Sequence, residues 1–261
     1  MSETEQLIQL IQTKQKLVAL LAPSFPIMYA YPQIVGKLKR LGFEFVLEVS
    51  MGAHITNEQV LAVVRAANPE ARFITNPCPT ITRLIRNKYP QLLKYLMKVD
   101  SPMVCTAKIS LERYPGYRPV FIGPCIAKKL EAREDYPNLN ILVLTYKEIN
   151  SVFQTLGIQD DPTDSQAKFD LDWVPERIYP LSGGLEKSCG VSHTMSKDQI
   201  AEVSGCVECG QILENFEKDP SIKLLDILSC MGGCIGGPGI DSTLTLDQRR
   251  HRVLDFWRSA T

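Results

Sequence analysis

Four cysteines follow short apolar segments that share one pattern. Cys78 stands after RFIT, Cys125 after PVFIG, and Cys230 and Cys234 form a C-x₃-C pair after LLDILS. Apolar runs of this length are typical of buried strands, so each cysteine group is expected just beyond the C-terminal end of a strand. Open α/β sheets bind ligands outside those strand ends. Four thiolates there are the soft ligand set of a 4Fe-4S cubane, so the sequence predicts that Cys78, Cys125, Cys230 and Cys234 bind one.

Two other interpretations of these cysteines stay open. A single cysteine at a strand end is often a small buried core residue, but three such ends in one chain are hard to explain that way. Structural zinc is the main alternative metal; it usually takes two C-x₂₋₄-C pairs, and only Cys230 and Cys234 are that close. The prolines beside Cys78 and Cys125 would stiffen the approach, and the glycines around Cys234 would let backbone come close to an inorganic group.

Strand-like and helix-like segments alternate along the chain, which predicts an α/β fold with parallel sheets flanked by helices. The expected strands are Lys16–Leu21, Phe43–Val49, Ala71–Thr75, Pro119–Ile122, Ile141–Leu144, Arg177–Pro180 and Leu224–Leu228. The expected helices are Ile34–Leu41, Asn57–Ala67, Ile81–Tyr95, Tyr146–Leu156, Lys197–Phe216 and Leu246–Ser259. The acidic segment Gln159–Trp173 is expected to be an exposed loop.

Composition and charge argue against several classes of partner. The 261 residues carry 29 basic and 29 acidic side chains, so no footprint for nucleic acid or an anionic membrane is expected. The N-terminus has Glu3 and Glu5 where a secretory signal would be basic, and the apolar run Leu17–Ala22 is too short to span a bilayer. The eight cysteines are expected as reduced thiols or ligands rather than disulfides. A cytoplasmic protein is therefore expected.

The cysteine segments resemble those of the catalytic domain of iron-only (FeFe) hydrogenases, the C-terminal domain of the large subunit. That family has a Thr-Ser-Cys-Cys-Pro segment, a Pro-Cys-x-x-Lys-x-x-Glu segment and a C-x₃-C segment followed by glycines. Here they read Thr75–Pro79, Pro124–Glu131 and Cys230–Gly237. Weaker similarities are Ala22-Pro23-Ser24 to a first-strand loop and Ser182-Gly183-Gly184 to a Thr-Gly-Gly turn. The chain resembles a short, divergent member without ferredoxin domains, similar to minimal or sensory types.

The resemblance implies a fold and a cofactor. It implies a single domain over residues 1–261 with two lobes of mostly parallel sheet, approximately 17–123 and 124–245, and a C-terminal helix at 246–261. The metal cluster would lie in the crevice between the lobes. The four cysteines would hold the cubane, and Cys234 would also bridge to a diiron subsite with carbonyl, cyanide and bridging dithiolate ligands. The whole cofactor is the H-cluster.

The resemblance also implies roles for single residues. Lys128 would donate a hydrogen bond to one cyanide and act with Cys234 in catalysis, and the Pro23–Ser24 loop would serve the other cyanide. An ordinary solvated lysine is the alternative for Lys128. The other residues expected around the cofactor are Ala22, Pro124, Ser182, Gly183 and Gly233.

Several positions depart from the family pattern. Pro77 stands where the family has its proton-transfer cysteine, and proline has neither an acidic proton nor an N–H group. Leu228 replaces a methionine, Asp226 replaces a glutamate, and Gly52–Ile55 offers no counterpart to an acid of the proton path. His54 could stand in for that acid, although a surface histidine or one satisfied by a partner is the simpler interpretation. These losses affect proton supply and leave the cluster ligands in place.

Two functions stay open. The first is reversible hydrogen oxidation and proton reduction, or hydrogen sensing, with a redox partner such as ferredoxin and with maturation proteins that load the diiron subsite. The second is a non-catalytic 4Fe-4S protein of the same fold, in iron–sulfur assembly or redox sensing, which Pro77 favours. Cys206 and Cys209, with Cys189 and Cys105, could also hold a second metal or form a redox pair, with small packing residues as the alternative.

Overall fold

The computed structural model describes residues 1–259, and a four-stranded parallel sheet forms the centre of its first lobe. The strands are β1 (Leu17–Leu21), β2 (Phe45–Glu48), β4 (Arg118–Gly123) and β5 (Leu142–Thr145), in the order β2-β1-β4-β5. All residues of β1 are buried, because helices cover both faces of this central parallel strand.

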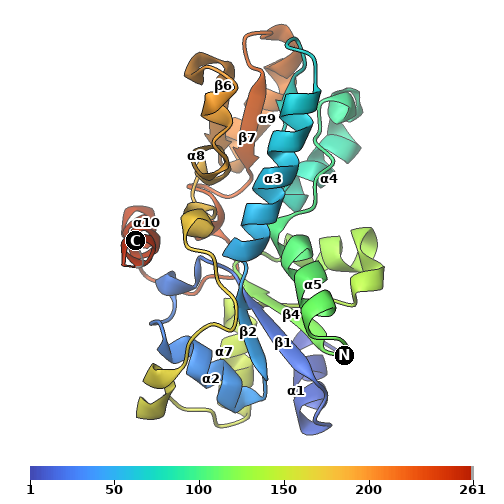
Figure 1. Ribbon diagram of the computed structural model, residues 1–261. Coiled ribbons are helices and arrows are strands. Elements are labelled where there is room, and N and C mark those ends of the chain that lie inside the picture. The colour runs from blue at the N-terminus through green and yellow to red at the C-terminus, as the bar shows by residue number, and fades with distance from the viewer. Residues whose placement is uncertain (260–261) are drawn as a thin grey trace.

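A second sheet of three parallel strands forms the other lobe, at the top of Figure 1. Its strands are β3 (Phe73–Ile74), β6 (Ile200–Ser204) and β7 (Leu224–Leu228), in the order β3-β7-β6. The expected α/β fold with two lobes of parallel sheet is therefore confirmed. Neither sheet comes from one continuous segment, so the lobes do not divide at residues 123–124. The first sheet includes β5, which follows that point, and the second includes β3, which precedes it.

Helices cover both sheets and join them. Within residues 1–259 the α-helices are α1 (Glu3–Gln12), α2 (Gln33–Leu41), α3 (Ser50–Ala66), α4 (Pro79–Lys88), α5 (Pro102–Arg113), α6 (Ala127–Leu130), α7 (Tyr146–Thr155), α8 (Gly184–Cys189), α9 (Cys206–Asn215) and α10 (Leu246–Arg258). α5 packs against β1 and β4, α7 against β4 and β5, and α9 against β6. The long α3 contacts α5 in the first lobe and α8 in the second, so it ties the lobes together (Figure 1).

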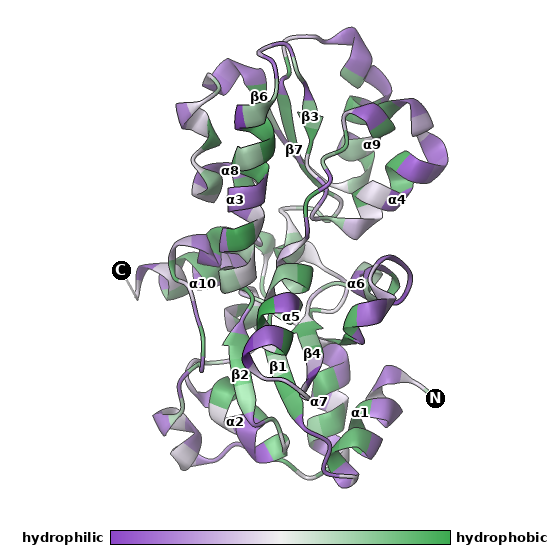
Figure 2. Ribbon diagram, turned by 45° about the vertical axis from the view of Figure 1, so that its right-hand side comes forward, coloured by the Kyte–Doolittle hydropathy of each residue, from purple (hydrophilic) through white to green (hydrophobic). Residues whose placement is uncertain are grey.

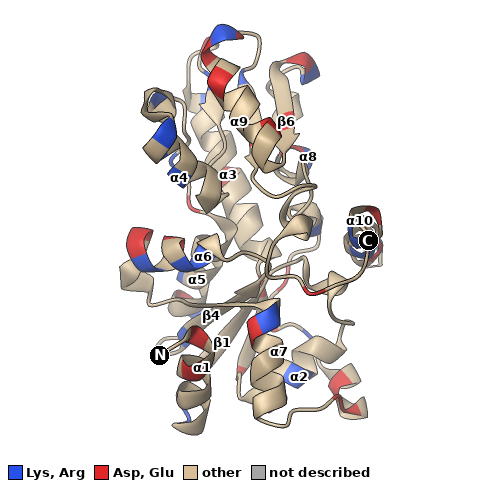
Figure 3. Ribbon diagram, turned by 180° about the vertical axis from the view of Figure 1, so that it is seen from behind, with Lys and Arg blue, Asp and Glu red and all other residues tan. Residues whose placement is uncertain are grey.

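The hydrophobic core is divided between the lobes. Figure 2 shows apolar residues concentrated on the strands and polar residues on the outer helices. The largest cluster of buried apolar side chains lies around the four-stranded sheet and includes Phe25 and Tyr146, whereas a smaller one around β3 and β7 includes Ile74 and Phe216. In Figure 3 basic and acidic residues are interspersed over the helices of both lobes. Within residues 1–259 no helix combines the length and the apolar character that a membrane span requires.

The predicted strands are confirmed with one exception, and their ends are shifted by at most two residues. The exception is Arg177–Pro180, where the structure has a 3₁₀ turn at Pro175–Ile178. Pro175 at the start of the turn fixes its backbone torsion, and the Arg177 guanidinium is buried against Glu48, with Nε 3.0 Å from Oε1. A long-range ion pair therefore determines the conformation of this segment.

The helix predicted over Lys197–Phe216 is wrong in its first part. Residues 200–204 form strand β6, which pairs with β7, and only then does α9 begin. Gly205, with a φ of 107°, separates the two elements. Pairing at the edge of the second sheet therefore overrides the helical pattern of IAEVS.

Other helix predictions differ in extent. α3 begins at Ser50, seven residues before the predicted start, and Thr56 lies inside it, where its hydroxyl donates to Gly52 O. The predicted helix Ile81–Tyr95 ends at Lys88, since Pro90 starts a 3₁₀ turn. The predictions did not include α1, α5, α6 and α8. The last two residues of the expected C-terminal helix at 246–261 lie outside the described residues.

The segment Gln159–Trp173 is less exposed than predicted. A 3₁₀ turn at Pro162–Gln166 packs against α2, and Asp164 is buried there with Arg40, whose Nε donates to Oδ1 at 2.7 Å. Leu171 forms a bridge with Leu47 of β2. The segment therefore covers the outer edge of the first sheet.

Candidate metal centre

The four cysteines predicted as ligands come together at the junction of the two lobes. Cys125 follows β4 of the first sheet, whereas Cys78 follows β3 and the pair Cys230 and Cys234 follows β7 of the second. Burial, followed by the nearby thiols of Cys125 and Cys78, raises the pKa of Cys230 to about 12. Burial, then Cys125, Cys78 and Cys230, raise the pKa of Cys234 well above its ordinary value. The four thiols are therefore close enough to act on one another.

Backbone contacts join the loops of the second and third cysteine segments. Gly239 N donates to Pro124 O at 2.8 Å, which links the loop of Cys125 to the residues after Cys234. A Cβ on Gly237 would lie 2.6 Å from the same carbonyl oxygen. This close approach therefore requires glycine at position 237.

Gly233 makes a similar contact with the segment before α8. Its φ is 95°, and a Cβ there would lie 2.6 Å from Pro180 O. Beside it, Ser182 N donates to Gly232 O at 3.1 Å. The structure thus gives these glycines a role in loop packing, while their contact with a bound group stays a prediction.

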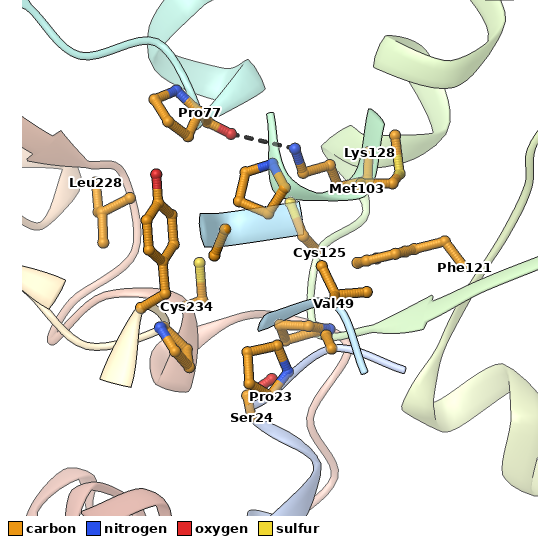
Figure 4. Close-up of a pocket in the computed structure, with 16 residues that line it drawn as sticks. Pro23, Ser24, Val49, Pro77, Met103, Phe121, Cys125, Lys128, Leu228 and Cys234 are labelled. Carbon is orange, nitrogen blue, oxygen red and sulfur yellow. Dashed lines mark hydrogen bonds between the residues drawn. The ribbon is translucent and has the colours of Figure 1, made fainter. Parts of the chain in front are cut away.

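A mostly apolar cavity of about 80 Å³ opens beside two of the cysteines (Figure 4). Residues of both lobes line it: Ala22, Pro23, Ser24, Val49, Ala53, Pro77, Pro102, Met103, Phe121, Pro124, Cys125, Lys128, Tyr179, Pro180, Leu228 and Cys234. Most residues predicted around the cofactor are in this set. Ser182, Gly183 and Gly233 are not: Ser182 lines a separate cavity of about 500 Å³ beside α10, Gly183, with a φ of 69°, precedes α8, and Gly233 packs closely against Pro180.

Lys128 is buried at this cavity, with 8% of its surface exposed. Its Nζ donates to Pro77 O at 3.1 Å (Figure 4) and lies 2.6 Å from Glu131 Oε2. An ordinary solvated lysine at this position is therefore excluded. Because Pro77 directly precedes Cys78, the lysine also joins the first cysteine segment to the second.

Ser24 uses its hydroxyl proton inside the protein. Its Oγ is buried and lies 2.8 Å from Tyr146 Oη. Tyr146 donates its own proton to Ala22 O at 3.0 Å, so the Ser24 hydroxyl is the donor between the two side chains. The side chain of Ser24 therefore has no proton left for a group in the cavity.

Tyr179 is a site residue that the sequence analysis missed. Its side chain lines the cavity, and its hydroxyl is buried without a hydrogen-bond partner. Burial, followed by the nearby carboxylate of Asp226, raises the pKa of Tyr179 well above its ordinary value, so the hydroxyl stays protonated. A strand over Arg177–Pro180 would give no reason to place this side chain at the cavity; the turn at Pro175–Ile178 does so.

The remaining cysteines do not form the set of four that the sequence suggested. The thiol of Cys189 donates to Asn57 O at 3.5 Å, and Cys105 lies by Thr56, so both are apart from the C-x-x-C pair. The thiols of Cys206 and Cys209 instead donate to the carbonyls of Ser229 and Leu228, at 3.3 and 3.4 Å, directly before Cys230. Cys206 is exposed and Cys209 is buried.

His54 has partners, as the simpler interpretation of the sequence expected. Its Nδ1 lies 3.1 Å from Glu176 Oε1, and its ring stacks on Trp173 at a centroid distance of 4.6 Å. Burial raises the pKa of Glu176, and the other carboxylate oxygen, Oε2, has no hydrogen-bond partner. A replacement of the missing proton-path acid by His54 stays a hypothesis.

A single metal ion does not match the arrangement of potential ligands. Among residues 1–259 no three His, Cys, Asp or Glu side chains stand close enough to share one ion. A cubane has a different requirement, because each of its four irons takes its own thiolate. Four cysteines, one for each iron, are the number of ligands that a cubane takes.

The fold and the site define an α/β protein with a cysteine-lined cavity between two parallel sheets. A family model described as "Iron only hydrogenase large subunit, C-terminal domain" matches residues 15–238. The chain belongs to this family.

Relatives include both an assembly factor and hydrogenases. The cytosolic Fe-S cluster assembly factor NAR1 of Encephalitozoon cuniculi is 26% identical over 188 residues, which cover 64% of this chain and 51% of that protein. Iron hydrogenase 1 of Clostridium pasteurianum is 23% identical over 257 residues, 79% of this chain and 45% of that protein. The chain thus spans about half the length of the curated relatives it matches.

Solved structures share the fold. A variant of the FeFe-hydrogenase HydA1 from Chlamydomonas reinhardtii superposes with a TM-score of 0.73, covering 97% of this chain and 88% of that chain, at 17% sequence identity. At this identity the likeness shows the fold alone.

Proposed function

We propose that the chain binds a 4Fe-4S cubane through Cys78, Cys125, Cys230 and Cys234, and a diiron subsite in the adjacent cavity. With this H-cluster it would oxidise hydrogen and reduce protons reversibly, or sense hydrogen. The observation that carries the proposal is the delivery of cysteine loops from both sheets to one cavity. Membership of the iron-only hydrogenase family supports it.

The residues present fit both groups. Four thiols match the ligand demand of a cubane, and Cys234 lines the cavity, where its sulfur would bridge to the subsite. The cavity wall is mostly apolar, which suits carbonyl and cyanide ligands, and it includes the buried ammonium of Lys128. When bound, the diiron subsite would supply the chemistry that forms and cleaves hydrogen.

The chain's own residues would then exclude water and hold the ligands. Val49, Met103 and Phe121 form apolar parts of the wall, and the Pro23–Ser24 loop closes it next to β1. Lys128 would place positive charge near a cyanide nitrogen, where a dry surrounding strengthens the attraction. Pro77 leaves the position before Cys78 without an acidic proton, which favours sensing or slow turnover.

A non-catalytic 4Fe-4S protein is the second candidate. It is favoured by Pro77 and by the engagement of Lys128 with the Pro77 carbonyl and with Glu131. The similarity to a protein named an Fe-S cluster assembly factor supports it as well. In this alternative the cubane would serve in iron–sulfur assembly or redox sensing.

The deciding experiment is anaerobic expression with and without hydrogenase maturation proteins, followed by infrared spectroscopy. We expect carbonyl and cyanide stretching bands only with the maturation proteins, and a cubane signal by electron paramagnetic resonance in both samples. A cubane without such bands would establish the second candidate, and a protein without iron would refute both. Ferredoxin is the redox partner to test, and the reducing cytoplasm is the compartment in which we expect both proteins.

A further inference from the structure

The hydrogen-bond donors of the cavity are not equally available. The Lys128 ammonium already donates to Pro77 O and pairs with Glu131. The Ser24 hydroxyl already donates to Tyr146. Among the lining residues, Tyr179 has the one hydroxyl or ammonium group that makes no hydrogen bond.

An unpaired buried hydroxyl is costly, so its retention calls for an explanation. Such a group destabilises a protein relative to one in which the same hydroxyl has a hydrogen-bond partner. A ligand that brings an acceptor atom into the cavity would remove this cost. The unpaired hydroxyl of Tyr179 therefore indicates an acceptor on the group that the cavity binds.

Backbone packing fixes Tyr179 in place. Its N–H donates to Glu176 O at 3.0 Å within the turn. A Cβ on Gly184 would lie 2.9 Å from Tyr179 Cα, and a Cβ on Gly233 would lie 2.6 Å from the carbonyl oxygen of the next residue, Pro180. The tyrosine is thus clamped between the start of α8 and the loop that carries Cys234, as expected of a preorganised donor.

We infer that the Tyr179 hydroxyl donates a hydrogen bond to an anionic acceptor, of the chemical class of a metal-bound cyanide, on the group held in this cavity. The inference rests on the proposed function, because it takes the diiron subsite as that group. Tyr179 would thus position the bound group through a hydrogen bond, a contact for which the side chains of Lys128 and Ser24, already bonded to Pro77 and Tyr146, are less available. Lys128 on α6 would then contribute positive charge beside the subsite, and Tyr179, in the segment before α8, would contribute the hydrogen bond.

The test compares the wild type, Tyr179→Phe and the control Tyr95→Phe, all expressed with maturation proteins. Tyr95 is suited as the control because its hydroxyl contacts Glu217 at 3.4 Å at an exposed position outside the cavity lining. We expect equal cubane signals in all three proteins and displaced cyanide bands in Tyr179→Phe alone. The shift of those bands on exchange into D₂O should also shrink in Tyr179→Phe, which loss of ring packing would not produce.

Other outcomes are decisive as well. Cyanide bands and D₂O shifts identical in wild type and Tyr179→Phe would overturn the inference and leave the proposed function standing. Absence of the bands in the wild type would instead overturn the diiron proposal together with the inference. Fluorotyrosine at position 179 retains the ring and strengthens the donor, so it should displace the cyanide bands in the opposite direction, and no displacement would refute the contact even if Tyr179→Phe does not fold.

Discussion

Two groups of residues around one cavity differ in how completely they are suited to the proposed function. The cysteine side, formed by the loops of Cys78, Cys125 and Cys230–Cys234, has its loops joined by hydrogen bonds and by glycines that cannot carry a Cβ. The remaining cavity wall, which includes Ser24, Pro77, Lys128 and Tyr179, has its Ser24 hydroxyl and its Lys128 ammonium hydrogen-bonded to the protein itself. The residues proposed for cluster binding and those proposed for proton supply are therefore distinct: all four proposed cysteine ligands are present, whereas Pro77 supplies no acidic proton.

The largest effect is expected on the cysteine side. Cys230→Ala should remove essentially all cluster iron, from about four irons per chain to almost none, because one corner of the cubane loses its thiolate. Iron analysis and the cubane resonance signal of anaerobically purified protein measure this directly.

Cys206→Ala is the matched control for that substitution. Cys206 lies next to the same loop, since its thiol donates to Ser229 O, yet we do not assign it as a ligand. Its removal should leave the iron content unchanged. Retention of iron in Cys230→Ala together with its loss in Cys206→Ala would move the ligand from position 230 to position 206.

On the remaining cavity wall the expected effect concerns the rate of hydrogen turnover. Pro77→Cys would place an acidic proton at the cavity while the Pro77 backbone carbonyl, which accepts from Lys128, is retained by any residue. If the diiron subsite loads, hydrogen evolution with reduced methyl viologen should rise by about 100-fold, the usual order for a positioned general acid.

Pro77→Ala separates proton transfer from simple relief of the proline ring. It removes the ring and adds no acid, so its rate should stay near that of the wild type. Equal rates in Pro77→Cys and Pro77→Ala would mean that proton supply at this position does not limit the reaction.

The cysteine side could be predicted from the sequence because its signals are local. An apolar run followed by a cysteine with proline or glycine neighbours defines a strand end within a few residues, and β3, β4 and β7 lie where these runs predict them. β3 and β7 pair in one sheet, so the approach of Cys78 to Cys230 follows from parallel pairing. Cys125 follows β4 of the other sheet, so its approach to them depends on how the two lobes are arranged, which the local patterns do not reveal.

The remaining cavity wall could not be predicted in the same way, because contacts between residues far apart in the sequence determine its conformation. The turn that directs Tyr179 depends on the buried pair of Arg177 and Glu48, which are 129 residues apart in the chain. The partners of Lys128 show the same limit: Glu131 is one turn away and readable, whereas the Pro77 carbonyl is 51 residues distant. Motif similarity identified Lys128 and could not reveal that its ammonium donates to the Pro77 carbonyl.

The smallest expected effect concerns the strand that leads to the cysteine side. Asp226 of β7 is buried, and its carboxylate accepts one hydrogen bond from Glu186 N at 3.2 Å. Burial, with smaller contributions from the charges of Glu202 and Glu186, raises its pKa from the ordinary 3.8 to about 6. The folded state thus holds the proton more tightly than the unfolded state, so the associated stability is present at low pH and is lost as pH rises through about 6.

Asp226→Asn should remove this pH dependence. Between about pH 5 and pH 7 the wild type should lose about 1 kcal/mol of unfolding free energy through this group, whereas the variant should not. Urea denaturation at several pH values measures the difference between the two proteins, in which the contributions of the other raised carboxyls, Glu48 and Glu176, cancel. Parallel pH profiles would mean that the Asp226 carboxylate is ionised in the folded protein at little cost.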